Sequence, residues 1–247
     1  MNDRHFLAAD WPAPESIIAG TTLRTGGRSE APFDSWNHGI HAGDVDEHVL
    51  ANRHLLRSRL DLPSEPYWLR QVHGPRVVAA LGASDEPEAD ASWTDQPDTV
   101  CVALTADCLP VLFAHRNGIV VAAAHAGWRG LAAGVLENTV AAMPGRPGDL
   151  MAWLGPAISQ AAFEVGDEVR AAFLATDSSA ASAFEKNPAG RWQADLYALA
   201  RQRLAAIGVD EVYGGDRCTY QEDGHFFSYR RDGQCGRMAS IIAIRRA

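Results

Sequence analysis

The sequence predicts a single mixed α/β (α+β) domain, built of mixed β-sheets flanked by helices over residues 1–247. A chain of 247 residues is long enough to bury one full hydrophobic core. Short apolar runs typical of strands alternate with segments whose apolar residues recur at helical spacing. No repeat or low-complexity tract interrupts this pattern, and the one linker-like stretch is an Ala/Ser-rich segment at 176–183. These observations favour one domain over two.

In the first third of the chain, three strands and one helix are predicted. A weakly alternating run at 16–22 predicts a strand that ends in a glycine turn. Helical spacing of apolar residues predicts a helix over 46–60, with its first residue, an aspartate, as the N-cap. Two further strands are predicted over 67–72 and 76–81, because a Gly-Pro turn separates these runs. The acidic segment 82–97 is expected to be a loop.

The centre of the chain carries the most apolar runs. Segments 99–104, 110–114 and 118–124 are rich in Val, Leu and Ile, a composition that predicts strands buried on both faces. Apolar residues at helical spacing then predict a helix over 129–143, which a Pro-Gly pair ends. A further strand is predicted over 151–154.

The last third of the chain is expected to add two helices and three strands. The helices cover roughly 167–176 and 195–207, each with an aspartate at its start as the predicted cap, and a glycine follows the second helix. Strand-like runs close the chain at 211–213, 225–230 and 237–244.

Composition and charge restrict the class of partner. The net charge is −9 and Lys and Arg do not cluster, so an extended nucleic-acid surface is not expected, although a basic pocket for a small anion fits the sequence. The N-terminus lacks the apolar stretch of a signal peptide, and the apolar runs are too short to span a bilayer. Four cysteines follow no disulfide spacing and are expected to be reduced thiols or metal ligands. We therefore expect a cytoplasmic protein that acts on small molecules and contacts neither membrane nor nucleic acid.

Three side chains that suit chemistry lie where a predicted strand meets a turn: His73, Cys108 and His125. A thiolate and two imidazoles suit Zn²⁺, and three protein ligands leave a fourth position for water or substrate, as in catalytic zinc sites. The same atoms suit a site without metal, in which His125 deprotonates Cys108 to a nucleophilic thiolate. Cys108 also suits a core position, because cysteine packs as a small hydrophobe. The spacings of 35 and 17 residues match no compact zinc motif, so these alternatives stay open.

A potential anion site lies at the start of the helix that follows His125. Free backbone N–H groups and the positive end of the helix dipole face that position. Arg129 within it, and Arg24 beside the Gly26-Gly27 turn, would supply guanidinium groups for phosphate or carboxylate. Both arginines equally suit solvated surface ion pairs. Most of the nine histidines are expected to be exposed, including those at 38, 41, 48 and 54.

Six short motifs, which occur in order along the chain, together resemble the YfiH family, also called the laccase-domain or polyphenol oxidase family. They are QVHG (71–74), TADCLP (105–110), HAGWRG (125–130), GPAI (155–158), FEVG (163–166) and FFSYRR (226–231). The resemblance runs from about Thr22 to Met238 and so covers nearly the whole chain. Arg28, the Trp36 and His38 pair, and Cys235 depart from the residues usual for the family, which puts substrate preference in doubt more than catalysis.

The resemblance implies a domain related in fold to the cysteine-hydrolase domain of cytotoxic necrotizing factor toxins. It implies that His73, Cys108 and His125 bind zinc and form the catalytic centre. Asp107 is expected to belong to that centre, either by orienting a ligand or by capping a turn. Substrate or phosphate contacts are expected from five residues placed near the centre, for which structural roles are equally suitable: Arg24, Asn37, Gln71, Arg129 and Ser228.

The resemblance also implies an activity, that of a zinc-dependent purine nucleoside phosphorylase with adenosine deaminase activity. Its partners would be phosphate and adenosine, inosine, guanosine or methylthioadenosine, in a monomer or homodimer. The alternative is a peptidoglycan editing amidase, which removes L-Ser from UDP-MurNAc-L-Ser in some bacterial relatives. A true copper-dependent laccase is disfavoured because the nine histidines include no His-x-His pair, although copper-dependent oxidation in vitro remains compatible with the ligand set.

Overall fold

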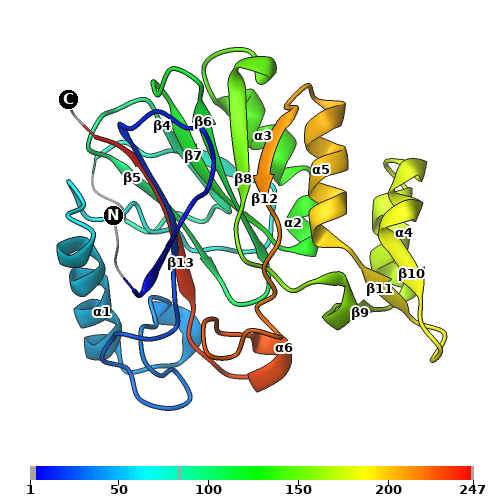
Figure 1. Ribbon diagram of the computed structural model, residues 1–247, viewed down its shortest axis with the longest axis horizontal. Helices are drawn as coiled ribbons and strands as arrows, with labels where there is room; N and C mark the ends of the chain where they lie inside the picture. Colours follow the sequence, from blue (N-terminus) through cyan, green and yellow to red (C-terminus); the bar gives the residue numbers. More distant parts are fainter. Residues whose placement is uncertain (1–3, 83–84, 246–247) are drawn as a thin grey trace.

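The computed structural model describes residues 4–82 and 85–245, and two larger sheets pack against each other in it (Figure 1). The larger sheet has the strand order β12 (Glu211–Gly214), β8 (Leu150–Leu154), β6 (Leu109–His115), β7 (Val121–Ala126), β4 (Ala91–Thr94) and β3 (Val77–Ala79). The second sheet has the order β1 (Phe6–Ala8), β2 (Ile17–Thr22), β13 (Met238–Ile244) and β5 (Val100–Thr105). A small third sheet has the order β10 (Phe184–Lys186), β11 (Trp192–Ala194) and β9 (Glu164–Val165).

Helices cover the outer faces of the two larger sheets. The α-helices are α1 (Asp46–Arg59), α2 (Trp128–Ala132), α3 (Val135–Ala142), α4 (Asp167–Leu174), α5 (Leu196–Ala206) and α6 (Tyr229–Asp232). Short 3₁₀ turns are η1 (Ile40–Ala42), η2 (Pro147–Asp149), η3 (Gln160–Ala162) and η4 (Ser178–Ala183). Helices α3 and α5 pack on the six-stranded sheet and α1 packs on the four-stranded sheet, whereas α4 lies beside the third sheet at the far end of the molecule (Figure 1). The mixed α/β fold class is confirmed.

Alternation along the central strands explains why they are almost wholly apolar. In β6, Val111 and Phe113 face the helices of the six-stranded sheet, while Leu112 and Ala114 face the other sheet. Successive side chains of a strand point to opposite faces, so a strand between two cores has no polar face. All residues of β6, β7, β8 and β13 are accordingly buried. The strands predicted over 99–104, 110–114, 118–124, 151–154 and 237–244 are confirmed.

The strand predicted over 67–72 is wrong. Tyr67 and Arg70 make only isolated bridges, and the rest of the segment is irregular. The Gln71 side chain explains the difference, because its amide donates to Leu104 O at 2.8 Å and accepts from Leu104 N at 2.7 Å. A side chain thus satisfies the edge of β5 where a neighbouring backbone would otherwise pair.

The strand predicted over 225–230 is also wrong. His225 N and Phe226 N both donate to Glu222 O in a turn, and the segment then enters α6. Its two phenylalanines produced the strand-like pattern, but they are buried in a small cluster with Met238 rather than in a sheet. Local apolar composition did not distinguish these two arrangements.

The helix predicted over 129–143 is two helices. Gly134 has a φ of 93°, a left-handed conformation that interrupts α-helical hydrogen bonding between α2 and α3. The apolar residues before and after this glycine keep helical spacing, so the pattern alone did not reveal the break. The helix predicted over 46–60 is confirmed as α1, and those over 167–176 and 195–207 as α4 and α5.

Two of the three predicted aspartate caps are wrong. Asp46 and Asp167 are the first helical residues, and Val45 and Gly166 precede them as N-caps without a side-chain hydrogen bond. Asp195 does cap α5, since its Oδ1 accepts from Ala198 N at 2.9 Å. Acidic residues in the first turn still interact favourably with the helix dipole.

Two segments predicted to lack regular structure contain it. The acidic segment 82–97 includes β4, which pairs with β3 and β7, while its residues 83–84 lie outside the described residues. The Ala/Ser-rich stretch includes η4, whose Ala180 and Ala183 are buried, so it is not a linker.

The domain ends predicted at 1 and 247 lie outside the described residues. None of the helices in the described parts of the chain combines the length and the hydropathy that a membrane span requires.

His38 does not follow the expectation that the histidines at 38, 41, 48 and 54 are exposed, because its side chain is fully buried. It packs between the rings of Trp36 and Trp68, and neither of its ring nitrogens has a hydrogen-bond partner among the described residues. Burial, with the charge of Arg53 nearby, lowers the pKa of His38 from 6.5 to about 3. The imidazole is therefore neutral in the folded protein at neutral pH.

We expect acid to destabilise the fold through His38. The unfolded chain protonates this side chain below its ordinary pKa of 6.5, whereas the folded protein resists protonation down to about pH 3. The His38 contribution is therefore complete above pH 6.5 and is lost as the pH falls toward 3, by about 2 kcal/mol at about pH 5. Urea unfolding at neutral pH and at about pH 5 should show that His38→Phe lacks this loss and that His54→Phe, at an exposed position on α1, retains it. An unchanged pH dependence in His38→Phe would contradict the prediction.

Candidate metal centre

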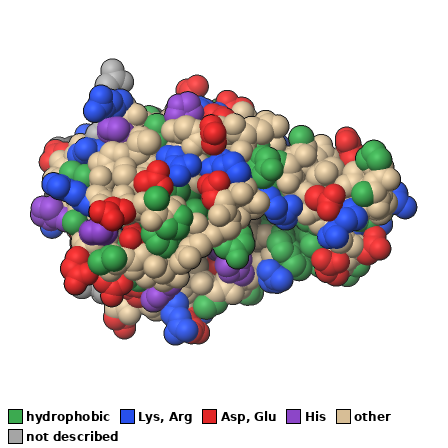
Figure 2. Space-filling view, turned by 90° about the horizontal axis from the view of Figure 1, so that it is seen from below, with side chains coloured by type: hydrophobic (Ala, Val, Ile, Leu, Met, Phe, Trp, Pro, Cys, Tyr) green, Lys and Arg blue, Asp and Glu red, His purple; other side chains and the backbone are tan. Residues whose placement is uncertain are grey.

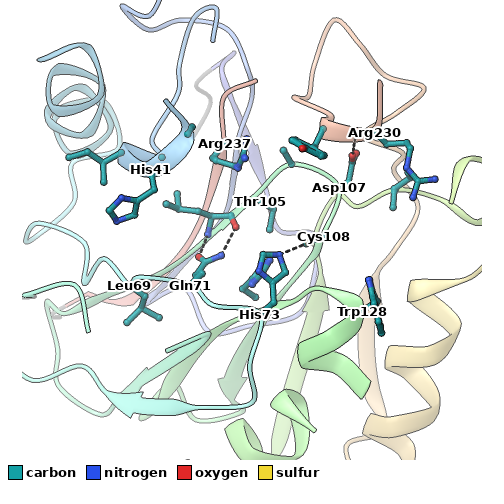
Figure 3. Close-up of a pocket in the computed structure, with 18 of the residues that line it drawn as sticks. His41, Leu69, Gln71, His73, Thr105, Asp107, Cys108, Trp128, Arg230 and Arg237 are labelled. Atoms are coloured by element: carbon teal, nitrogen blue, oxygen red, sulfur yellow. Dashed lines mark hydrogen bonds between the residues drawn. The ribbon is translucent and has the colours of Figure 1, made fainter. Parts of the chain in front are cut away.

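Three potential metal ligands, His73, Cys108 and His125, meet at one end of the core between the two larger sheets (Figure 3). Their ligand atoms all lie within 4.8 Å of one another, and Cys108 Sγ is 3.9 Å from His73 Nε2. The rings of His73 and His125 stand edge to face, with centroids 4.7 Å apart. All three residues are candidates from the sequence, and the fold brings them together.

Strand register explains why Cys108 and His125 meet. Cys108 directly precedes β6, and Pro110 of β6 lies opposite His125 of β7 in the antiparallel ladder. Because side chains alternate, Cys108 shares a face with Leu112, and His125 shares a face with Ala123. That face is the one between the two sheets. The third group, His73, comes from the turn before β3.

A buried aspartate, Asp90, connects two of the three groups. Its side chain is fully buried, and its Oδ1 lies 2.8 Å from His125 Nδ1. The same carboxylate accepts the backbone N–H groups of Val72, His73 and Gly74, at 3.2, 2.8 and 2.7 Å. One side chain therefore orients the His125 ring and also holds the turn that carries His73.

Electrostatics keep Asp90 ionised. Burial by itself raises the pKa of Asp90, but the hydrogen bond and positive charge of His125, together with the backbone donors, lower it below its ordinary value. An ionised Asp90 accepts from His125 Nδ1–H, which directs Nε2 toward the other two groups. A carboxylate behind a metal-binding histidine is a common arrangement that fixes the ring and its tautomer.

Asp90 replaces Asp107 in the orienting role that the sequence suggested. Asp107 does line the cavity, but its Oδ1 accepts from Thr219 Oγ1 and its Oδ2 from Arg230 N, both at 2.7 Å. It therefore ties two C-terminal segments together, and both of its carboxylate oxygens are engaged by groups other than His73 and His125. Asp90 is not among the residues predicted from the sequence, because it lies in the acidic segment that was expected to be a loop. The β-prone run that follows it is a signal for a strand.

The thiol of Cys108 and the imidazole of His125 favour each other's charged form. Burial by itself raises the pKa of Cys108. The positive charges of His125 and His73, and their hydrogen bonds to the sulfur, lower this pKa by more, so the pKa of Cys108 lies below its ordinary value. Burial lowers the pKa of His125, but the Cys108 thiolate and Asp90 raise it well above its ordinary value. Together the two groups provide a thiolate, which is the form that binds metal and attacks carbonyls.

Gly127, the residue before α2, leaves room for the three groups. A Cβ added there would lie 2.9 Å from Cys108 Sγ and 3.0 Å from His73 Cδ2. Its φ of −60° and ψ of 154° are available to any residue, so a side chain is excluded by space alone.

We expect Gly127→Ala to weaken metal binding with little change in stability. The added methyl group displaces Cys108 or His73, and displacement of a ligand should reduce metal affinity by about tenfold or more. Gly74→Ala is the matched control, because an added Cβ there meets its nearest atoms at 3.7 Å. Competition with a chromophoric chelator and thermal unfolding measure the two quantities. Equal metal affinities for Gly127→Ala and Gly74→Ala would contradict this account.

The three groups lie in a cavity of about 490 Å³. Its side chains are unevenly distributed around them. Trp128 and Arg230 lie on one side of His73, and His41 and Leu69 lie on the other (Figure 3). The cavity volume falls within the range usual for small-molecule sites.

The five predicted substrate contacts lie in different places. Gln71 lines the cavity, although its amide is engaged with Leu104. Arg129 is exposed, packs over the Trp128 ring at 4.4 Å and is not among the cavity-lining residues. Asn37 is fully buried behind the cavity wall, where its Oδ1 accepts from Gly39 N and Arg237 N, each at 2.9 Å.

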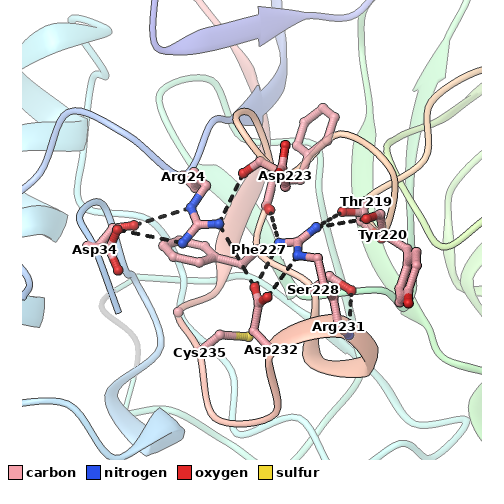
Figure 4. Close-up of polar contacts among 12 residues, drawn as sticks. Arg24, Asp34, Thr219, Tyr220, Asp223, Phe227, Ser228, Arg231, Asp232 and Cys235 are labelled. Carbon is pink, nitrogen blue, oxygen red and sulfur yellow. Dashed lines mark hydrogen bonds and ion pairs between the residues drawn. The ribbon is translucent and has the colours of Figure 1, made fainter. Parts of the chain in front are cut away.

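Arg24 and Ser228 contact the segment that forms α6 (Figure 4). Arg24 lies over the Phe227 ring and within 3.9 Å of Asp232, and it donates to Asp223 O at 3.0 Å. Ser228 caps α6 by accepting from Arg231 N. Neither residue lines the cavity.

The surface around these elements carries both signs of charge. Figure 2 shows Lys and Arg side chains interspersed with Asp and Glu on the face seen from below. The group formed by His73, Cys108 and His125 is the one cluster of three or more potential His, Cys, Asp or Glu ligands found among residues 4–82 and 85–245.

Comparisons with known proteins relate the whole chain to one family. A family model described as multi-copper polyphenol oxidoreductase laccase matches residues 18–245. The chain is 53% identical over 241 residues to "Purine nucleoside phosphorylase YfiH" of Escherichia coli strain K12, which covers 96% of this chain and 98% of that protein. It is 34% identical over 262 residues to "Purine nucleoside phosphorylase YlmD" of Geobacillus stearothermophilus, covering 98% and 95%.

Solved structures have the same fold. The crystal structure of Neisseria meningitidis protein NMB0706 matches with a TM-score of 0.94 and 51% identity, covering 98% of this chain and 100% of that chain. The crystal structure of YlmD from Geobacillus stearothermophilus matches with a TM-score of 0.90 and 31% identity, covering 100% and 98%.

Proposed function

This chain belongs to the multi-copper polyphenol oxidoreductase laccase family, the YfiH family, and from that premise we propose that it is a zinc-dependent purine nucleoside phosphorylase. The proposed reaction splits adenosine, inosine, guanosine or methylthioadenosine with phosphate into the free base and the sugar 1-phosphate. The observation that carries the proposal is the His73, Cys108 and His125 cluster within a small-molecule cavity, in a chain 53% identical to a protein named a purine nucleoside phosphorylase.

The donor set fits zinc. Two imidazoles and one thiolate are ligands that Zn²⁺ prefers, and three protein ligands leave one coordination position for water or substrate. The space left by Gly127 and the Asp90 carboxylate behind His125 fit the same assignment. When bound, zinc supplies Lewis-acid chemistry to the atoms beside it. His73, Cys108 and His125 would hold it.

The protein's own groups meet the demands of phosphorolysis. A phosphate oxygen forms a bond to C1′ of the sugar while the bond from C1′ to the base breaks, so an anion and a nucleoside must be held side by side. Arginine side chains line the cavity and suit the anion. Aromatic side chains also line it and suit a planar base. Adenosine deaminase activity in the same cavity is part of the proposal, because an open coordination position admits water.

A second activity, amide hydrolysis on UDP-MurNAc-L-Ser, is favoured by one observation. Cys108, His125 and Asp90 form a series of contacts in the order nucleophile, base and orienting carboxylate. This order is that of cysteine and serine hydrolases, in which the base is itself held by a third group. The thiolate would attack the amide carbonyl carbon, and the C–N bond would break as L-Ser leaves with a proton from His125. Water would then hydrolyse the thioester, which releases the acyl group as a carboxylate and regenerates the thiol.

The experiment compares both substrates on protein of measured zinc content. Adenosine with phosphate should yield adenine and ribose 1-phosphate, whereas deamination should yield inosine without requiring phosphate. Removal of metal by a chelator should abolish phosphorolysis, and added Zn²⁺ should restore it. The absence of sugar phosphate from every nucleoside at any zinc loading would reject the proposed phosphorylase. Release of L-Ser from UDP-MurNAc-L-Ser alone would assign the amidase instead.

A further inference from the structure

Three arginines line the cavity, and they differ in how their charge is balanced: Arg53, Arg230 and Arg237. Arg53 is buried, lies 4.0 Å over the Trp68 ring and pairs with Glu86 at 2.6 Å. Its charge is thus neutralised within the wall. Neither Arg230 nor Arg237 forms an ion pair with a carboxylate in the described parts of the chain.

Arg237 is held in place without being neutralised. Its Nη1 donates to the carbonyl oxygens of Cys235 and Gly236 at 2.6 and 3.0 Å, and its backbone N donates to Asn37 Oδ1. The Gly39 backbone packs against its stem, because a Cβ added at Gly39 would lie 2.7 Å from Arg237 Cγ. Within the described residues, Nε and Nη2 have no hydrogen-bond partner. These two N–H groups form the edge of a guanidinium that binds an oxyanion in bidentate fashion.

Arg230 has a different setting. It is exposed, donates through Nη1 to Glu164 O at 2.9 Å and packs over the Phe163 ring at 5.4 Å. Tyr229, its neighbour in α6, is 60% exposed, and both residues line the cavity together with Trp128. This side of the cavity therefore presents aromatic surfaces, which suit a flat apolar ligand better than an anion.

We propose that the Nε and Nη2 edge of Arg237 anchors phosphate, and that the nucleobase lies against Trp128 on the opposite side of the three metal ligands. The assignment rests on the proposed phosphorylase function. Figure 3 shows Arg237 above Thr105 and Gln71, and Trp128 on the far side of Cys108. C1′ of the sugar then lies beside the His73, Cys108 and His125 group, with phosphate on one face of this carbon and the base on the other. Arg24 and Arg129, which the sequence suggested for phosphate, lie outside this cavity.

The test measures KM for phosphate and for inosine separately. Arg237→Met should raise the KM for phosphate by about 10- to 100-fold, the loss expected for a charged hydrogen bond, with the KM for inosine changed by less than about threefold. Arg237→Lys should recover part of the phosphate affinity, because it keeps the charge but not the bidentate edge. Trp128→Ala should raise the KM for inosine by about tenfold and leave that for phosphate unchanged. Arg146→Met, at an exposed arginine that pairs with Asp149 and does not line the cavity, is the matched control and should change neither.

A second measurement separates this assignment from the proposed function. Calorimetric titration of inorganic phosphate into the zinc-loaded wild type and into Arg237→Met needs no turnover. Binding to the wild type that is lost in Arg237→Met and partly restored in Arg237→Lys supports the phosphate site, even if no nucleoside is cleaved. Wild-type protein that binds no phosphate, equal binding by Arg237→Met, or a loss found in Arg230→Met instead would each overturn it.

Discussion

Cys108→Ala is expected to lose both bound metal and phosphorolysis. The thiolate is the one anionic ligand in the group, and its removal leaves two imidazoles, one of them on an exposed turn. We expect metal affinity to fall by more than about 100-fold. Substituting a residue that only hydrogen-bonds a metal ligand already lowers metal affinity by about 10- to 100-fold, and loss of a ligand itself should cost more. Elemental analysis after dialysis and release of hypoxanthine from inosine measure the two losses.

Cys101→Ala is the matched control for this substitution. Cys101 is fully buried in β5, where burial raises the pKa of its thiol to about 12, so that it stays protonated and packs as a hydrophobe. Its removal should cost stability on the order of 1 kcal/mol and leave metal content unchanged. Full zinc occupancy in Cys108→Ala would contradict the metal site, and full activity with zinc absent would contradict its catalytic role.

Asp90→Asn is expected to weaken both the metal site and the fold. The carboxylate faces four donors, from His125 and the backbone of 72–74. An asparagine turns an N–H₂ group toward some of these donors and removes the negative charge beside His125. Metal affinity should fall by about 10- to 100-fold, and the free energy of unfolding by about 2–4 kcal/mol. Chelator competition and urea unfolding of the metal-free protein separate these two effects.

Asp107→Asn is the control that distinguishes the two aspartates. Asp107 contacts Thr219 and Arg230 rather than a metal ligand, so its amide should leave zinc affinity within about threefold of the wild type. A loss of zinc in Asp107→Asn but not in Asp90→Asn would assign the orienting role to Asp107, as the sequence first suggested.

Sequence pattern was most informative where strands are buried on both faces. The runs that became β5 to β8 are almost wholly apolar because each face of these strands meets a core, and such runs are rarely anything but buried strands. The sequence pattern was least informative where a single residue determines the backbone conformation or the strand pairing. Gly134 breaks a helix whose apolar spacing continues through it, and the Gln71 side chain takes the place of a strand partner at the edge of β5.

The sequence by itself identified the reactive groups, because Cys108 and His125 lie at or near the ends of apolar strands and all three groups, His73 included, fall within motifs that resemble one family. Only the tertiary structure decided which groups support them. Asp90 contacts His125, which lies 35 residues further along the chain, and Arg237 contacts Asn37, which lies 200 residues before it. Strand pairing and loop packing bring these residues together. The physical reason is that hydrogen bonds between distant segments leave no periodic signal in the chain, whereas burial of a strand or helix does.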